Sequence, residues 1–115
     1  MKAIGVIPAR LAATRLPNKP LLDIAGKPMI QWVWERSAAA RTLDQVLVAT
    51  PDPEIVSACQ SFGAEAVLTR PDHATGTDRV AEVVRVREAD IAVNIQGDEP
   101  LTHPDALDAL VEGLI

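Results

Sequence analysis

The sequence predicts an α/β protein with a doubly wound, mostly parallel sheet and helices on both faces. Short apolar runs recur along the 115 residues, and segments with helical periodicity separate them. Such an alternation of strands and helices is typical of parallel strands joined by right-handed crossovers. The length favours one domain, residues 1–115, and an apolar content of 48% is ordinary for a globular protein.

Four apolar runs are the predicted strands, at residues 3–7, 45–49, 66–68 and 91–95. Each run is continuous rather than alternating, which is typical of parallel strands covered on both faces. The carboxyl ends of parallel strands lie at one edge of the sheet, where ligands of open α/β folds gather. We therefore expect the residues that follow the first, second and fourth strands to form one site.

The first two predicted helices lie between the first three strands. Residues 28–40 carry apolar side chains at helical spacing. Residues 53–62 form the second helix, with Asp52 as its cap, Pro53 at its first position and Gly63 as its stop.

Two further helices follow the third and the fourth strand. Thr75 and Asp78 fit a capping box at the start of one, and Thr102 and Asp105 open the other. The last helix carries four apolar residues on one face, namely Leu107, Leu110, Val111 and Leu114. The order of elements is therefore β-loop-α-β-α-β-α-β-α.

Composition excludes several classes of protein. A net charge of −5 and an aromatic content of 3% argue against nucleic acid or an anionic membrane as a partner. Cys59 is the only cysteine, which excludes an intrachain disulfide, and its place on an apolar helix face predicts a core residue. The first apolar stretch is too short for a signal peptide or a membrane span, so a cytoplasmic location is expected. All serines lie in predicted helices, which disfavours a Ser–His–Asp hydrolase.

A basic loop follows the first strand, with the sequence IPARLAATRLPNKPL at residues 7–21. The loop contains no glycine, so it is neither a P-loop nor a dinucleotide-binding fingerprint. Its cations are Arg10, Arg15 and Lys19, and guanidinium groups match phosphate oxygens well. Three prolines limit its conformations. The pattern favours phosphate binding over the alternative, a solvated basic loop.

An acidic loop, Gln96-Gly97-Asp98-Glu99-Pro100, follows the fourth strand. Asp98 is the predicted ligand of a divalent metal, because Mg²⁺ takes one or two protein carboxylates together with substrate phosphates. A turn closed by the acidic side chains is an equally good explanation of the loop on its own. Together with the basic loop at the same edge, it predicts a site for a metal-bound polyphosphate.

A third polar segment, TRPDHATGTDR at residues 69–79, precedes a helix. The free backbone N–H groups at a helix start can bind an anion or contact a base edge. The alternative is a capped helix with solvent-facing polar residues. His73 is a weak catalytic candidate because no nucleophile lies near it in the sequence.

These motifs resemble the N-terminal half of the 3-deoxy-manno-octulosonate cytidylyltransferases, also called CMP-Kdo synthetases. The resemblance covers all 115 residues and depends on five motifs in order: IPARxxxTRLPxKPL, GKPMI, VAT, RxDHxTGTDR and VNIQGDEP. It implies a Rossmann-like nucleotidyltransferase fold. It also implies that CTP and 3-deoxy-D-manno-octulosonate (Kdo) give CMP-Kdo and pyrophosphate, with Mg²⁺, for lipopolysaccharide biosynthesis.

The resemblance also assigns roles to residues of this sequence. Arg10 and Lys19 are the implied catalytic residues, and Asp98 is the implied metal ligand. The implied nucleotide-binding residues are Ala9, Arg10, Arg15, Lys19, Arg70, Thr75, Gly76, Gln96 and Gly97.

Members of the resembled family are much longer than this chain, so we expect a fragment with an incomplete sheet. The absent half is expected to carry a second metal ligand, most contacts to Kdo and the interface of a homodimer. Two alternatives stay open. One is a nucleotidyltransferase for another acidic sugar, and the other is a catalytically silent, truncated nucleotide-binding module.

Overall fold

Four parallel strands form the sheet of the computed structural model, which describes residues 2–12, 19–97 and 103–114. The strands are β1 (Ala3–Pro8), β4 (Gln45–Thr50), β5 (Glu65–Leu68) and β6 (Ile91–Asn94), in the order β5-β4-β1-β6. The central strand β1 pairs with β4, Ile4 opposite Gln45, and with β6, Ala3 opposite Ile91. All four predicted strands are confirmed, with ends that differ by one residue at most.

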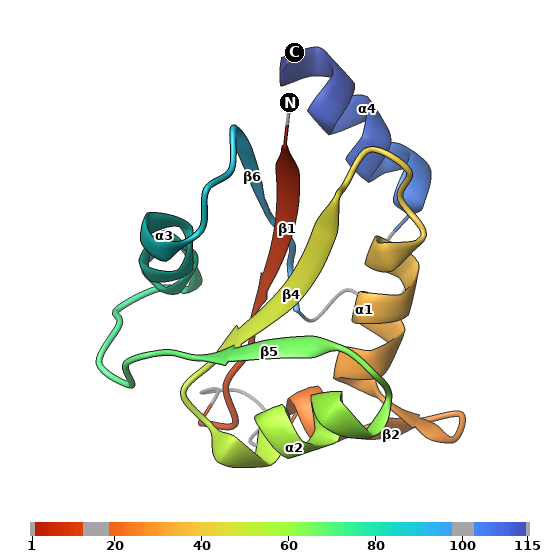
Figure 1. The fold of residues 1–115 in the computed structure, drawn as a ribbon. Helices are drawn as coiled ribbons and strands as arrows, with labels where there is room; N and C mark the ends of the chain where they lie inside the picture. Colours follow the sequence, from red (N-terminus) through yellow and green to blue (C-terminus); the bar gives the residue numbers. More distant parts are fainter. Residues whose placement is uncertain (1, 13–18, 98–102, 115) are drawn as a thin grey trace.

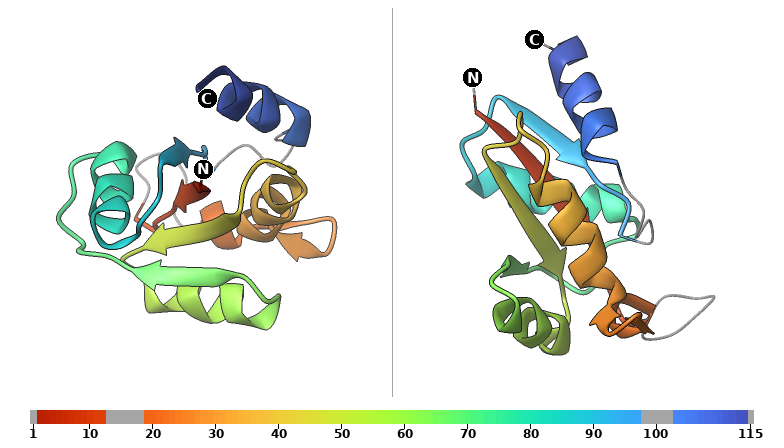
Figure 2. Two further views of the ribbon diagram at one scale, coloured as in Figure 1. Left: turned by 45° about the horizontal axis from the view of Figure 1, so that its top comes forward. Right: turned by 90° about the vertical axis from the view of Figure 1, so that its right-hand side faces the viewer.

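Helices cover both faces of this sheet (Figures 1 and 2). They are α1 (Met29–Ala38), α2 (Pro53–Ser61), α3 (Gly76–Val86) and α4 (Pro104–Leu114). Helix α3 lies on one face, and α1, α2 and α4 lie on the other. The predicted doubly wound α/β fold is confirmed.

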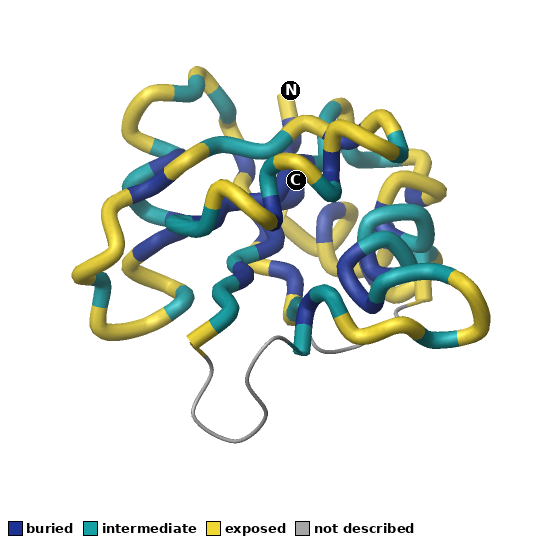
Figure 3. Tube along the Cα trace, turned by 90° about the horizontal axis from the view of Figure 1, so that it is seen from below, coloured by how far each residue is buried: buried dark blue, intermediate teal, exposed yellow. Residues whose placement is uncertain are grey.

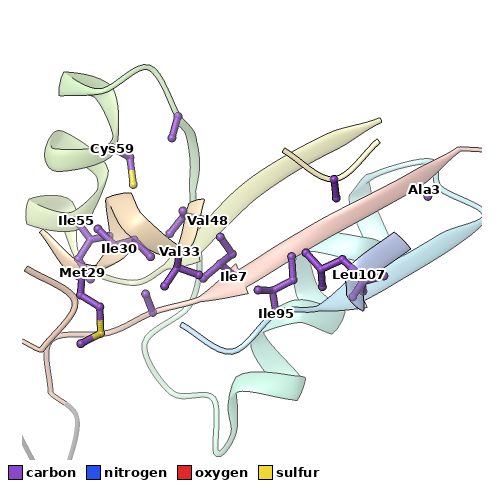
Figure 4. Close-up of a cluster of buried hydrophobic side chains, with 14 of the residues drawn as sticks. Ala3, Ile7, Met29, Ile30, Val33, Val48, Ile55, Cys59, Ile95 and Leu107 are labelled. Carbon is purple, nitrogen blue, oxygen red and sulfur yellow. The ribbon is translucent and has the colours of Figure 1, made fainter. Parts of the chain in front are cut away.

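Alternate residues of β1 supply two separate cores. Ile4 and Val6 pack with Val80 and Val83 of α3. Ala3 and Ile7 face the larger core against α1, α2 and α4 (Figure 4). Both sets are almost fully buried. Because both faces of β1 are covered, its sequence is a continuous apolar run.

Strand β6 departs from the predicted continuous burial. Ile91 and Val93 are buried, whereas Ala92 and Asn94 are exposed. The buried residues join the core on the α4 side. The α3 core contains residues of β1 and β4 but none of β6, so one face of this edge strand is left open.

The segment before α1 contains a hairpin that the sequence pattern did not reveal. A 3₁₀ turn, η1 (Lys19–Leu21), leads into β2 (Asp23–Ile24) and β3 (Lys27–Pro28), which are antiparallel. Ala25 and Gly26 connect them with φ values of 51° and 89°, as a tight two-residue hairpin requires. Strands of two residues are too short to show a periodicity. Helix α1 starts at Met29, because Pro28 is extended.

The predicted helix starts differ in outcome. The Thr75 hydroxyl accepts a hydrogen bond from the Asp78 backbone N–H at 3.1 Å, which confirms the cap of α3. Asp52 occupies the predicted cap position of α2 and Pro53 its first position, but the Asp52 side chain makes no capping hydrogen bond. The carboxylate binds the first loop instead, as described below.

Helix α4 is confirmed, and the four apolar residues of its predicted face differ in burial. Leu107 and Val111 are buried, but Leu110 and Leu114 are 50% and 59% exposed. Part of this apolar face therefore lies at the surface. The predicted opening residue Thr102 lies outside the described residues.

The larger core contains Cys59, as predicted (Figure 4). Burial raises the pKa of its thiol to about 11, so the group is un-ionised at neutral pH. Within the described chain, no helix combines the length and the apolarity that crossing a membrane requires.

Candidate functional site

The carboxyl ends of the strands meet at one edge of the molecule, as predicted. Figure 3 views the chain from this side and shows buried segments surrounded by exposed ones. Backbone hydrogen bonds continue the sheet past the strand ends, from Ala9 N to Ala49 O at 2.9 Å and from Thr69 N to Thr50 O at 2.8 Å. The segments that follow β1, β4 and β5 are therefore adjacent.

Two glycines pack against Pro8, the last residue of β1. A β-carbon at Gly97 would lie 2.7 Å from the Pro8 carbonyl oxygen, a distance that real β-carbons do not tolerate. A β-carbon at Gly76 would lie 3.1 Å from Pro8 Cγ. The start of α3 and the segment after β6 thus approach the first loop from different sides, because neither residue has a side chain.

Positive charge gathers beside this contact. Arg79 of α3 is only 2% exposed, and its guanidinium donates to Thr69 Oγ1 at 2.9 Å and to the Arg70 carbonyl at 3.2 Å. Burial and, after it, the nearby charge of Arg10 lower the pKa of Arg79, while Asp52 acts in the opposite direction. The buried Arg79 therefore lies near a second guanidinium group, that of Arg10, and near the carboxylates of Asp52 and Glu82.

Arg10 itself is partly exposed. Within the described part of the chain, its side chain makes no hydrogen bond or ion pair. The preceding residue, Ala9, is buried, so the charged residue follows a fixed segment. A partly exposed guanidinium group on such a segment is suited to binding an anion.

The start of α3 contributes a second feature that attracts anions. The first N–H groups of a helix lack partners within it and carry the positive end of its dipole. The predicted residues Thr75 and Gly76 occupy this start, and Gly76 contacts Pro8. Gln96 and Gly97 lie on the other side of Pro8, after β6, and Gln96 is exposed.

Arg70 follows β5, but the described partners of its side chain do not include the first loop. Its guanidinium forms an exposed ion pair with Asp72 at 2.7 Å. Nearby, His73 contacts Glu82 at 2.6 Å, and this contact is the main reason why the pKa of Glu82 is lowered. The described contacts therefore do not join Arg70 to Arg10.

Two predicted site residues, Arg15 and Asp98, lie outside the described residues. Lys19 opens η1, a turn that packs against α1 and α2. The ranges that the structure covers contain no group of three or more His, Cys, Asp or Glu side chains that could hold a metal ion.

Sequence reasoning placed the segment that contains Asp52 at the site edge, but it gave neither Asp52 nor Arg79 a role in the site. Arg79 lies four residues before Val83, on the buried face of α3, and an arginine at such a helix position is a usable signal. Asp52 was taken for a helix cap. Its interaction with Leu11, 41 residues away, has no signal in the sequence.

An open parallel sheet with cations and a helix start at its carboxyl edge is typical of α/β proteins that bind nucleotides. Comparison with known proteins identifies the family within this class. The family model described as cytidylyltransferase matches residues 4–115. The chain therefore belongs to the cytidylyltransferase family.

The names of curated relatives are more specific than that of the family. The chain is 57% identical to a 3-deoxy-manno-octulosonate cytidylyltransferase of Syntrophobacter fumaroxidans over 99% of its own length and 47% of the relative's. It is 52% identical to the Escherichia coli protein of the same name, over 98% of this chain and 46% of that protein. The resemblance inferred from the motifs is confirmed, and the chain spans about half the length of these relatives.

A solved structure agrees with these relatives. It is that of a CMP:2-keto-3-deoxy-manno-octonic acid synthetase complexed with CTP, and its TM-score with this chain is 0.97 at 52% identity. The match covers 99% of this chain and 47% of that protein.

Proposed function

We propose that residues 1–115 form the CTP-binding portion of a 3-deoxy-manno-octulosonate cytidylyltransferase that makes CMP-Kdo for lipopolysaccharide biosynthesis. The observation that carries the proposal is the match to the synthetase complexed with CTP, at a TM-score of 0.97 over 99% of this chain. The cationic strand-end edge around Pro8 supports it, because a triphosphate needs such an edge.

In the proposed reaction, the anomeric hydroxyl oxygen of Kdo forms a bond to the α-phosphorus of CTP. The bond from that phosphorus to the α,β-bridging oxygen breaks, pyrophosphate leaves with the electron pair, and the hydroxyl proton is released. Such a transfer needs positioning and charge stabilisation but no covalent intermediate on the protein.

The proposed roles of the cations follow from this chemistry. Arg10 and Lys19, with Arg15, bind the triphosphate and stabilise the negative charge that grows on the leaving pyrophosphate. The partly exposed Arg10 is available for such a contact, and the buried Arg79 adds positive charge behind it.

The proposed contacts to the nucleoside come from both sides of Pro8. Thr75 and Gly76 lie beside the cytosine, and Gln96 and Gly97 line the ribose. Ala9 contributes its backbone, and Arg70 completes the set. The packing of both glycines against Pro8 supports this assignment, because it brings the two segments next to the end of β1.

Mg²⁺ is part of the proposal, with Asp98 as its ligand. When bound, the ion would neutralise charge on the phosphate oxygens. Asp98 lies outside the described residues, and the described ones offer no three-residue metal cluster. A cytoplasmic, homodimeric full-length enzyme is also proposed, on the family resemblance alone.

Titration calorimetry with CTP and Mg²⁺, beside UTP, GTP and ATP, tests the binding proposal. We expect CTP to bind most tightly, and the absence of heat with CTP would contradict the proposal. A product assay with Kdo and other acidic sugars tests the reaction, and transfer to a different sugar would favour the first alternative.

The second alternative is a nucleotide-binding module without turnover. The coverage of only 47% of the CTP-complexed synthetase favours it for the isolated chain. CTP binding without CMP-Kdo formation would support this alternative, and turnover by the 115-residue chain would exclude it.

A further inference from the structure

We propose that Asp52 is a positioning residue for the described part of the first loop, residues 9–12. Its carboxylate holds the backbone beside Arg10 in the conformation that binds the phosphates of a nucleoside triphosphate. This inference rests on the proposed function, because it assigns a role within the same site.

The first support is where the Asp52 carboxylate binds. Asp52 stands at the cap position of α2, where an Asp side chain normally accepts a hydrogen bond from its own helix. It makes no such bond, and Oδ2 instead accepts from the backbone N–H of Leu11 at 2.8 Å. The exit of β4 is thereby tied to the first loop.

The second support is the position of Arg10 between two hydrogen bonds to the same strand exit. On one side, Ala9 N donates to Ala49 O at 2.9 Å. On the other side, Leu11 N donates to Asp52. The first bond involves backbone atoms alone, so Asp52 is the side chain on which this backbone geometry depends.

The third support is that Asp52 is itself anchored. Its backbone N–H donates to Thr50 Oγ1 at 3.1 Å, and Thr50 is fully buried. The Thr50 carbonyl in turn accepts from Thr69 N. The carboxylate thus extends from a strand of the sheet whose last residue is fully buried, which allows it to hold the loop backbone.

Charge gives Asp52 a second effect on the same loop. The nearby Arg10 lowers the pKa of the buried Arg79, and Asp52 acts against this shift. The negative charge of Asp52 therefore offsets part of the repulsion that Arg79 experiences from Arg10. Hydrogen bonding and charge can be separated by substitution, because an asparagine keeps an acceptor oxygen but has no charge.

Three variants of the 115-residue chain test the inference. Asp52→Ser can cap α2 but is too short to reach Leu11, and Asp52→Asn can still accept from Leu11. Asp44→Ser is the matched control, because Asp44 Oδ2 accepts from Ala3 N at 2.8 Å at the opposite edge of the sheet. The measurements are amide exchange at Leu11 by NMR and calorimetric affinity for CTP with Mg²⁺.

We expect Asp52→Ser to raise the exchange rate at Leu11 and to weaken CTP binding, each about tenfold. Asp52→Asn should keep both within about threefold, with a steeper loss of affinity as salt increases, because the net charge is more positive. Asp44→Ser should leave both quantities unchanged, even if it lowers the melting temperature.

Three results would overturn the inference. They are wild-type exchange at Leu11 in Asp52→Ser, wild-type CTP affinity in that variant, and an equal loss of affinity in Asp44→Ser. If the wild-type chain does not bind CTP, the proposed function fails. The exchange at Leu11 then still decides whether Asp52 holds the loop.

Discussion

The two edges of the sheet use carboxylates for different purposes. At the edge where the strands begin, Asp44 and Asp90 accept backbone N–H groups of Ala3 and Lys2. Asp108, which is buried, accepts the N–H groups of Arg41 and Thr42 in the same region. These carboxylates hold the connections in place, and each has protein partners.

The edge where the strands end combines a carboxylate with nearby guanidinium groups. Asp52 holds the first loop there, but the buried Arg79 and the partly exposed Arg10 lie beside it. Helix α3 also directs its N-terminus to this edge, at Gly76. The comparison shows that carboxylates at one edge bind backbone N–H groups of the strand connections, whereas the other edge also holds cations of the proposed ligand site.

Removing a proposed phosphate-binding cation or the proposed metal ligand should have the largest effect. We expect Lys19→Ala and Asp98→Asn each to lower CMP-Kdo formation by a full-length form about 100-fold or more, because charge stabilisation is lost. Lys2→Ala, at the other edge, is the control. Near-normal turnover in either variant, with an unchanged circular dichroism spectrum, would remove that residue from the site.

A methyl group at the contact between the loops should have the next largest effect. Gly97→Ala places a β-carbon 2.7 Å from the Pro8 carbonyl, so the backbone must shift. We expect calorimetry to show about tenfold weaker CTP binding, as misplaced contacts cost affinity. Gly113→Ala, with no atom within 4 Å, is the matched control and should bind CTP normally. Equal affinities in both variants would contradict the proposed role of this contact.

Changing the carboxylate at the opposite edge should affect stability and leave binding intact. Asp108→Asn should lower the melting temperature by several degrees, because its amide cannot serve the donors of Arg41 and Thr42 equally well. CTP affinity should not change. A loss of affinity at constant stability would show that the two edges are coupled.

The stability that Asp108 provides should depend on pH. Hydrogen bonds, that to the Thr42 side chain first, lower the pKa of Asp108 in the folded state. Its contribution is therefore fully present above the unfolded carboxyl pKa of about 4, and it disappears as pH falls through the lower folded value. The difference in melting temperature between wild type and Asp108→Asn should shrink over that acidic range. A constant difference would contradict this account.

The smallest effect is expected at the start of α3. Thr75→Ala removes the cap to Asp78 N and should cost about 1 kcal/mol of unfolding free energy. Thr75→Ser, which keeps the hydroxyl, should restore most of it. Urea unfolding measures both, and equal stability of the Ala variant and wild type would mean that the cap contributes nothing.

Much of the fold could be predicted because its signals are local. The four strands are apolar runs, and the cap at Thr75 depends on residues three positions apart. The burial of β6 and α4 could not be predicted, because it depends on what covers them. Ala92 and Leu110 have the same local pattern as buried residues but are exposed in the structure.

The candidate site also has a part that the sequence indicated and a part that it did not. The sequence singled out Ala9, Arg10, Gly76 and Gly97, and the structure places them around Pro8. The motifs also indicated the family, which the comparisons confirm. The binding and catalytic roles of all the predicted site residues, Arg15 and Asp98 among them, stay predictions.

The sequence by itself determined which segments form strands and helices, and which segments carry the charges of the candidate site. The tertiary structure alone decided which side chains support them. Asp52 binds Leu11 and Arg79 binds Thr69 because the order β5-β4-β1-β6 makes the exits of these strands neighbours. Such contacts join residues far apart in the chain, so no local pattern records them.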